Sequence, residues 1–341
     1  MAVIAVLGAG GWGTALAVMA NREGHTVRLW SPFQEELSAI RRDGEHKKLL
    51  PGVPVPPTIE LTTDIRCVTD AALTLLVVPS FAIAETAEKL KPVLPAGALV
   101  ANAGKGIETD THRRFTEVLQ EALPTARIVA LSGPSHAEEV GRGVPTSLVS
   151  ASTDVAAAEE VQDLLMCPQF RIYTSTDVIG VELGGALKNV IALAAGICDG
   201  LRMGDNTKAA LMTRGLSEIA RLGVALGARQ ETFAGLSGMG DLMVTCGSMH
   251  SRNRRAGILI GEGVSAKEAI RRIGTVEGYL AAETAYALSR ETGVEMPITE
   301  QCYRICYEGL SPRAALEALL TREKKYEWDQ PWLGDPVGDP E

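Results

Sequence analysis

The sequence predicts an α/β protein in which a mainly parallel sheet, covered by helices on both faces, is followed by an all-helical part. Up to about Tyr173, short apolar runs rich in β-branched residues alternate with helical patterns, which favours a parallel sheet. From about Val178 onward, long periodic segments rich in alanine and leucine follow, with almost no strand signal. A chain of 341 residues is long enough for two domains.

We place the two domains at residues 1–177 and 178–325. Two domains leave a cleft between them, which is a common place for a small-molecule site. Residues 326–341 are expected to form a flexible tail, because this segment contains Pro331, Pro336 and Pro340 together with several acidic residues.

The first domain opens with a strand, a glycine cluster and a helix. Ala2–Leu7 is an apolar, β-branched run, and Thr14–Arg22 has a helical pattern that ends at Gly24. A second helix is expected at Gln34–Arg42, and the proline-rich stretch Pro51–Pro57 is expected to be a loop. The further expected strands are short and apolar: Thr26–Trp30, Leu73–Val78, Ala98–Asn102, Arg127–Leu131, Thr146–Val149 and Phe170–Tyr173.

The second domain is expected to contain helices only. The expected helices are Val178–Cys198, Thr207–Leu226, Arg252–Gly261, Ser265–Ile273, Glu277–Thr292 and Pro297–Tyr307. The run Val178–Ile197 approaches the length of a membrane span, but Glu182 and Lys188 interrupt it. We therefore expect a buried core helix and no membrane insertion.

The composition narrows the range of partners and compartments. Lys and Arg number 33 against 42 Asp and Glu, which gives a net charge of −9. No broad basic field is therefore present for nucleic acid, and an anion must be bound by a local cluster.

The six cysteines form no C-x-x-C pair, and no secretory signal follows Met1, so we expect a cytoplasmic protein with reduced thiols. Cys302 and Cys306 are expected to be packing residues. The five histidines offer no metal-binding spacing, so no metal is predicted.

The glycine cluster Gly8-Ala9-Gly10-Gly11-Trp12-Gly13 fits the pattern G-x-G-x-x-G. Gly8 allows a tight turn, Gly10 lets the backbone approach a pyrophosphate, and Gly13 lets the helix pack close to the strand. The pattern alone is weak evidence, because many flexible turns match it. Here it lies between an expected buried strand and an expected helix, which predicts binding of a dinucleotide.

The choice between NAD and NADP is left open by the residues after the second strand. NAD-binding proteins usually place an acidic residue there, about 20 residues after the glycine turn, to hold the ribose 2′-hydroxyl. This chain has Trp30-Ser31-Pro32 instead, which removes a repulsion against a 2′-phosphate and slightly favours NADPH. Glu35 and Glu36 follow closely enough to keep NADH as an alternative.

Five segments together give the sequence a family resemblance. They are Gly8–Ala17, Asn102–Ile107, Leu131–Ala137, Glu182–Asn189 and His250–Asn253. In this order they resemble the bacterial NAD(P)-dependent glycerol-3-phosphate dehydrogenases, from about residue 3 to about residue 320. The resemblance implies a Rossmann-type doubly wound sheet followed by an α-helical substrate domain. It also implies reversible reduction of dihydroxyacetone phosphate to sn-glycerol 3-phosphate, with hydride transfer to C2, for glycerophospholipid synthesis.

The resemblance assigns the general acid and base of this reaction to Lys188. Most lysines on helices are solvated, but Lys188 lies within an apolar run, where burial and neighbouring cations would lower its pKa into a useful range. Asp241, which follows Gly238-Met239-Gly240, is implied to contact substrate hydroxyls near this lysine. The ordinary alternative for Asp241 is a turn aspartate.

The remaining site residues also follow from the resemblance. Ser251, Arg252 and Asn253 would meet a phosphate at a helix N-terminus, although these residue types also suit a helix cap. The implied substrate-binding residues are Lys105, Gly133, Ser135, Lys188, Asp241, Ser251, Arg252 and Asn253. The implied cofactor-binding residues are Gly8, Gly10, Gly11, Trp12, Gly13, Ser31, Lys105, Ala137, Arg252, Val276 and Glu277.

The sequence departs from the family at the end of the second strand, where the family frequently has arginine or histidine, and at two further places, and two other functions stay open. His136 stands where the family commonly has phenylalanine, and Thr275-Val276-Glu277 stands where it usually has Val-Val-Glu. One alternative is another two-domain dehydrogenase that acts on a hydroxy acid or a sugar phosphate, since fold alone does not fix the substrate. The other is a dinucleotide-sensing module without catalysis. The expected partner is a small phosphorylated substrate, and exposed apolar helix faces in the second domain would suit a homodimer.

Overall fold

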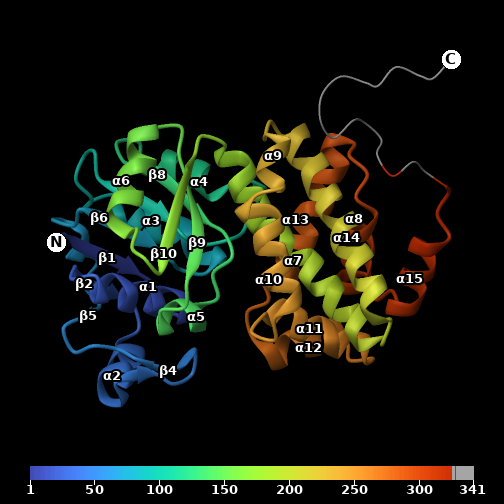
Figure 1. Cartoon of the computed structure of the whole chain (residues 1–341), viewed down its shortest axis with the longest axis horizontal. Helices are drawn as coiled ribbons and strands as arrows, with labels where there is room; N and C mark the ends of the chain where they lie inside the picture. The colour runs from blue at the N-terminus through green and yellow to red at the C-terminus, as the bar shows by residue number, and fades with distance from the viewer. Residues whose placement is uncertain (325–326, 328–341) are drawn as a thin grey trace.

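The computed structural model describes residues 1–324 and 327, and it places a sheet-based part beside a helical part (Figure 1). The sheet has eight strands in the order β10-β9-β8-β7-β6-β1-β2-β5, and its neighbouring strands are parallel except for β8 and β9. The strands are β1 Val3–Leu7, β2 Thr26–Trp30, β5 Glu60–Thr62, β6 Leu73–Leu76, β7 Leu99–Asn102, β8 Arg127–Ser132, β9 Thr146–Ala151 and β10 Phe170–Ser175. The predicted fold class and all the predicted strands are confirmed, and β5 is an additional edge strand.

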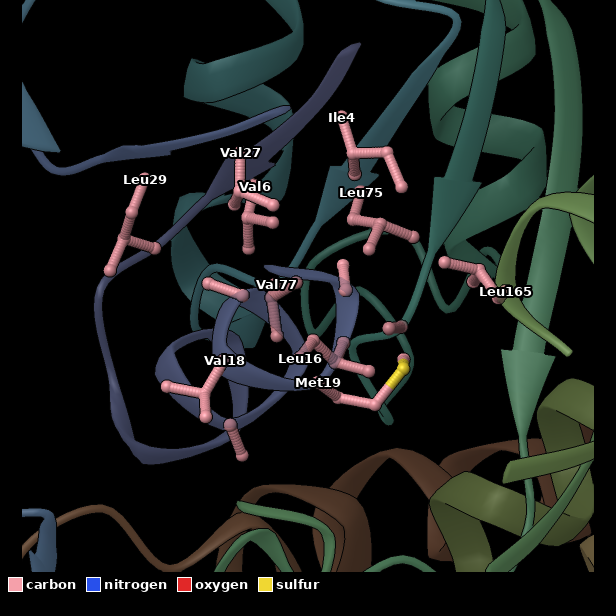
Figure 2. Packing of buried hydrophobic residues seen from close by; sticks show 14 of the residues in the cluster. Ile4, Val6, Leu16, Val18, Met19, Val27, Leu29, Leu75, Val77 and Leu165 are labelled. Carbon is pink, nitrogen blue, oxygen red and sulfur yellow. The ribbon is translucent and has the colours of Figure 1, made fainter. Parts of the chain in front are cut away.

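Helices cover both faces of the sheet because its central strands are apolar on both sides. In β1, Ile4 and Val6 pack into one core with helix α1 (Gly11–Arg22), and Figure 2 shows this contact. The alternate residues Ala5 and Leu7 pack into a second core on the opposite face. The other helices of this part are α2 Gln34–Asp43, α3 Ile83–Leu90, α4 Phe115–Ala122, α5 Ala137–Arg142 and α6 Val155–Leu165.

The prediction that Pro51–Pro57 is a loop is wrong for its first residues. Leu50–Pro54 forms strand β4, which pairs in antiparallel fashion with the short strand β3 (Glu45–His46). Prolines are tolerated in this ribbon because a two-stranded ribbon has an outer edge that needs no backbone donors. The ribbon packs beside the glycine turn, since a Cβ added at Gly11 would lie 2.6 Å from the carbonyl oxygen of Leu49.

Beyond Ser175, the described residues form helices and connecting turns with no strand. The helices are α7 Val178–Gly200, α8 Gly204–Ala225, α9 Gln230–Phe233, the π-helix η3 Leu236–Gly240, α10 Asp241–Gly247, α11 Arg252–Gly261, α12 Ala266–Ile273, α13 Glu277–Thr292, α14 Pro297–Tyr307 and α15 Pro312–Leu320. The six predicted helices are confirmed, with shifts of a few residues at some ends. The domain division at residues 177 and 178 stays a prediction, and the predicted tail lies almost entirely outside the described residues.

Helix α7 is the core of the helical part. It packs against α8, α10, α11 and α13, and nearly all its residues are buried. Within the described part of the chain, it is the one helix long and apolar enough to cross a membrane, yet 89% of its apolar window is buried inside the protein. This burial is typical of a core helix, as the sequence predicts.

Helices α7 and α11 approach each other at glycine positions. A Cβ added at Gly257 of α11 would lie 2.1 Å from the carbonyl oxygen of Leu193, and one added at Gly196 of α7 would lie 2.0 Å from that of Arg254. Only glycine permits backbone atoms to come this close. The contact fixes α11 beside the C-terminal part of α7.

We predict that Gly257→Ala destabilises the protein by about 1–3 kcal/mol, because the added methyl group must push two helix backbones apart. Gly247→Ala is the matched control, since a Cβ there meets no atom within 4 Å. Urea unfolding of both variants measures the free energy of unfolding. Equal stability of the two variants would contradict the close helix contact.

Candidate active site

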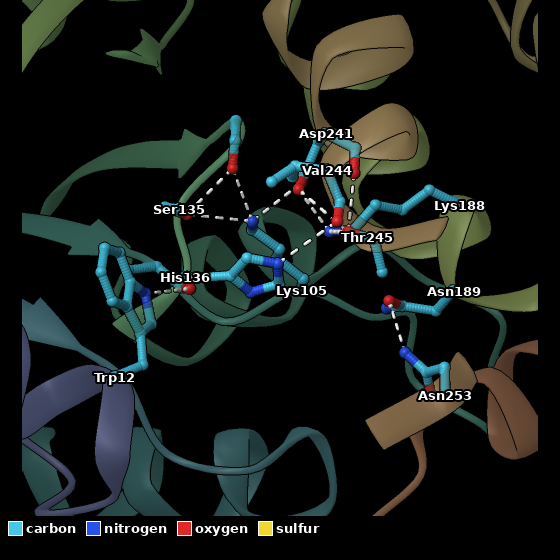
Figure 3. Close-up of polar contacts among 12 residues, drawn as sticks. Trp12, Lys105, Ser135, His136, Lys188, Asn189, Asp241, Val244, Thr245 and Asn253 are labelled. Atoms are coloured by element: carbon cyan, nitrogen blue, oxygen red, sulfur yellow. Dashed lines mark hydrogen bonds and ion pairs between the residues drawn. The ribbon is translucent and has the colours of Figure 1, made fainter. Parts of the chain in front are cut away.

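Lys188 extends from α7 into a buried polar cluster (Figure 3). The residue is 5% exposed, and its Nζ donates hydrogen bonds to Asp241 Oδ1 and to Thr245 Oγ1, the latter at 2.7 Å. Burial lowers the pKa of Lys188 to about 8, and the positive charge of Lys105 acts in the same direction. Asp241 opposes this shift. The ammonium group is therefore mostly ionised at neutral pH, but it can lose its proton at little cost.

Asp241 joins the two parts of the protein. It is the first residue of α10, directly after the π-helix, and it is 1% exposed. While Oδ1 accepts from Lys188, Oδ2 accepts from Lys105 Nζ at 2.8 Å, and Lys105 belongs to the sheet part. Two ammonium groups against one carboxylate leave this buried cluster with a net positive charge. Such a cluster suits an anionic ligand.

Lys105 is held at the carboxyl edge of the sheet by the loops around it. It follows β7 after a turn in which Asn102 Oδ1 accepts from the backbone N–H of Gly104 at 3.1 Å. Its Nζ donates to the carbonyl oxygen of Gly133 at 2.7 Å and to Ser135 Oγ at 3.2 Å. The fold thus brings Lys105 and Ser135 together with Asp241, as Figure 3 shows, and Gly133 joins them through its carbonyl oxygen.

These groups line a pocket of about 160 Å³ between the two parts. Its lining residues are Lys105, Ser135, His136, Lys188, Asp241, Thr245, His250, Ser251, Arg252, Asn253, Thr275 and Glu277. This volume is below the range of pockets for drug-sized ligands, so the pocket suits only a small substrate with few heavy atoms. Among the implied substrate-binding residues, Gly133 is outside this lining but is tied to it through Lys105.

The three residues at the start of α11 differ in their contacts. Ser251 is the helix cap, because its Oγ accepts from the backbone N–H of Arg254 at 3.2 Å. Asn253 Oδ1 accepts from the N–H of Gly278, and its Nδ2 donates to Asn189 Oδ1 at 2.8 Å. Asn253 therefore ties α11 to α7 and α13. Arg252 between them is exposed and lines the pocket.

The segment at the N-terminal end of α13 also lines the pocket, through Thr275 and Glu277. Glu277 Oε1 accepts from Ser80 Oγ at 3.2 Å, which links the helical part to the sheet part. Burial raises the pKa of Glu277. Val276 is buried in the helical core and lies outside the pocket lining.

Several pocket residues were absent from the predicted set. Thr245 lies one helical turn after Asp241, so its spacing is a signal that the sequence offered. His136 and His250 come from different parts of the chain, and their ring centroids lie 5.6 Å apart. Burial lowers the pKa of His136, whose Nε2 lies 3.3 Å from the carbonyl oxygen of Val244. No local pattern in the sequence indicates this histidine pair.

The glycine turn has the geometry that a dinucleotide needs. Gly8 has a φ of +117°, and a Cβ at Gly13 would lie 1.9 Å from the carbonyl oxygen of Gly8. A Cβ at Gly10 would meet nothing within 4 Å, so this side of the turn is open. No side chain caps α1, which leaves the first N–H groups of the helix available to a phosphate. The residues present therefore fit the pyrophosphate of a dinucleotide.

Other implied cofactor residues surround this turn. Trp12 Nε1 donates to the carbonyl oxygen of Ala103 at 3.2 Å, which fixes the indole beside the end of β7. Ala137 begins α5 and packs against the core under α1. Ser31 follows β2 and is 1% exposed, with its hydroxyl hydrogen-bonded to Glu36.

An open glycine turn at the sheet edge, combined with a buried lysine in a cationic pocket, is typical of a two-domain dinucleotide-dependent dehydrogenase for a small anionic substrate. The family models described as NAD-dependent glycerol-3-phosphate dehydrogenase N-terminus and C-terminus match residues 3–158 and 177–317. The chain belongs to this family.

Similar proteins agree over nearly the whole chain. The glycerol-3-phosphate dehydrogenase [NAD(P)+] of Desulfitobacterium hafniense is 52% identical over 97% of this chain and 94% of its own length. That of Moorella thermoacetica is 54% identical over 95% of this chain and 97% of its own length. The crystal structure of glycerol-3-phosphate dehydrogenase from Coxiella burnetii has a TM-score of 0.90 and 41% identity, covering 94% of this chain and 99% of that one.

We predict that Gly10→Val weakens dinucleotide binding without unfolding the protein. The new side chain enters open space, so the melting temperature should change little, but it fills the path of a pyrophosphate to the backbone. The dissociation constant should rise at least about tenfold, which corresponds to about 1.4 kcal/mol. Titration calorimetry with NADH and NADPH measures the effect, and unchanged affinity for both would contradict the location of the site.

Proposed function

We propose that this protein reduces dihydroxyacetone phosphate to sn-glycerol 3-phosphate with NADH or NADPH, and that the reaction is reversible. The observation that carries the proposal is the buried ammonium group of Lys188, hydrogen-bonded to Asp241 at the floor of a small cationic pocket. When bound, the reduced nicotinamide supplies a hydride to the carbonyl carbon C2. The residues of the chain supply the proton, bind the substrate and exclude water.

Lys188 is the general acid in the direction of reduction. Its Nζ gives a proton to the oxygen on C2 as that oxygen gains negative charge, and it takes the proton back in the direction of oxidation. A pKa of about 8 is close to neutral pH, which favours proton transfer in both directions. Thr245 and Asp241 hold the ammonium group in one place through their hydrogen bonds.

The substrate phosphate is bound by Arg252 together with the start of α11. The exposed guanidinium can form two parallel hydrogen bonds to a phosphate, and the hydroxyl proton of Ser251 is free to donate because its oxygen serves as the cap. Lys105 adds positive charge from the opposite wall, held there by Gly133 and Ser135. Asn253 holds α11 in position and presents its remaining amide proton.

Asp241 takes the hydroxyl end of the substrate. Its Oδ2 accepts one hydrogen bond, from Lys105, and keeps a lone pair for a substrate hydroxyl, whereas Oδ1 contacts both Lys188 and Thr245. The cofactor is held by Gly8, Gly10, Gly11, Trp12 and Gly13 on one side. Ser31, Lys105, Ala137, Arg252, Val276 and Glu277 are the further cofactor contacts that we propose.

The biological setting follows from the product. Glycerol 3-phosphate is the backbone of glycerophospholipids, so the enzyme would serve lipid synthesis from the cytoplasm. The expectation of a homodimer stays a proposal, and sedimentation of the full chain would test it.

We predict that Lys188→Met lowers kcat for dihydroxyacetone phosphate reduction by roughly 10²–10⁴-fold, because the proton donor is lost while the side-chain length is kept. Absorbance of NADH at the nicotinamide band measures the rate. Lys208→Met is the matched control, since Lys208 pairs with Asp199 outside the pocket. The control should keep the wild-type rate.

The two halves of this experiment separate binding from chemistry. Lys188→Met should still bind NADH, because the glycine turn is untouched. Full activity in this variant would exclude Lys188 as the proton donor. No oxidation of NADH by the wild type, despite tight binding of the dinucleotide, would exclude dihydroxyacetone phosphate as the substrate.

We predict opposite pH profiles for the two directions. Reduction needs protonated Lys188, so kcat/KM should be constant at lower pH and fall as the pH rises through about 8. Oxidation needs the neutral amine, so its kcat/KM should rise through the same range. Asp241→Asn removes the carboxylate that raises the pKa of Lys188, and it should move both limbs to lower pH. Unchanged pH profiles of kcat/KM in this variant would contradict the pairing of Lys188 with Asp241.

A further inference from the structure

The carboxyl end of β2 carries an acidic group that the linear sequence does not place there. Ser31 stands directly after β2, and its Oγ donates to Glu36 Oε2 at 2.6 Å. Glu36 lies in the first turn of α2, and Oε1 of the same carboxylate lies 3.4 Å from His46 Nε2 in β3. Three separate segments therefore hold one carboxylate at the end of the second strand.

In dinucleotide-binding sheets, the end of the second strand lies beside the ribose that carries the 2′-hydroxyl or 2′-phosphate. An acid at the end of the second strand accepts a hydrogen bond from the ribose 2′-hydroxyl of NAD and repels the 2′-phosphate of NADP. We propose that Glu36 has this role, so that the protein prefers NADH to NADPH. This proposal rests on the proposed function only in that the site binds a nicotinamide dinucleotide.

The carboxylate of Glu36 is available and ionised. Its side chain is 26% exposed, whereas that of His46 is 8% exposed, so the carboxylate has one open side and one anchored side. Burial opposes the charge, but hydrogen bonds from His46 and Ser31 hold the pKa of Glu36 below its usual value. The charge is therefore present at neutral pH.

The cations near this carboxylate are poorly placed for a 2′-phosphate. Pro32 and Phe33 follow Ser31 and carry no charge. In α2, Arg41 donates to the carbonyl oxygen of Leu61 and Arg42 to Asp43. The charge of Lys48 does reach Glu36, but Lys48 is exposed and screened by water.

This inference reverses the slight preference for NADPH that the sequence alone gives. That preference rests on the absence of an acid at residues 30–32, and the absence is real. The fold supplies the acid from the next helix instead, by way of Ser31.

The test measures dissociation constants of NADH and NADPH by calorimetry on the full chain, without triose phosphate. Wild type should bind NADH more tightly. In Glu36→Gln, the ratio of the NADPH constant to the NADH constant should fall by about tenfold, the factor expected for one hydrogen bond to a charged group. Ser31→Ala should shift the ratio in the same direction. Glu35→Gln, the same charge change at an exposed neighbour in the same turn, should leave it unchanged.

The outcomes separate this proposal from the proposed function. Binding of both dinucleotides by wild type, with an unchanged ratio in Glu36→Gln and Ser31→Ala, would overturn the role of Glu36 alone. The role of Glu36 would also be overturned if Lys48→Gln changed the ratio of the two dissociation constants more than Glu36→Gln does. Binding of neither dinucleotide by the wild type would overturn both proposals.

Discussion

The ammonium group of Lys188 is buried in the interior of the protein, and a buried charge is costly unless it is paired and hydrogen-bonded. This requirement explains why Asp241 and Thr245 lie where they do, one turn apart on α10 and both facing α7. It also explains the role of Lys105, which shares Asp241 and keeps the cluster positive for an anion. The cluster joins Lys105 of the sheet part to Asp241 of the helical part, so the chemistry and the contact between the two parts depend on the same ions.

A second buried polar contact anchors the same helix to the sheet part. Glu182, six residues before Lys188 in α7, accepts from Arg114 Nη1 and from the backbone N–H of Thr116, both at 2.9 Å. Burial raises the pKa of Glu182 in spite of these partners. Removal of one partner from such a pair typically costs about 3–5 kcal/mol, because the other charge stays buried without compensation. The two charges that interrupt the apolar run thus both tie α7 to the sheet part, Glu182 directly and Lys188 through Asp241, and Val181 adds an apolar contact with Ala130 and Ala151.

Much of the fold could be predicted because local patterns decide it. The strand β1, the glycine turn and α1 are encoded in neighbouring residues, and so is the long apolar pattern of α7. The ribbon of β3 and β4 could not be predicted, because its prolines argue against a strand and its stability comes from packing beside the glycine turn. The short helices α9 and α10 lack the length for a clear periodic signal.

The candidate site, like the fold, contains residues that the sequence indicates and residues that it does not. In the sequence, Lys188 stands out because it lies within an apolar run, and Asp241 because it follows a glycine-rich turn. In contrast, the pair His136–His250 depends on chain segments that only the fold brings together, and the sequence places Glu36 near the end of β2 without indicating its hydrogen bond to Ser31. Asn253 is a mixed case: the sequence indicates a polar helix start, but its bonds to Asn189 and Gly278 give it a structural task as well.

Burial in this cluster tunes Lys188 for proton transfer. The most direct test of this tuning is an NMR titration of the full chain with isotope-labelled lysine side chains, in which the Lys188 signal is assigned by its absence from Lys188→Met. The account predicts a titration midpoint of about 8 for Lys188. A midpoint near the ordinary lysine value of about 10.4 would contradict it.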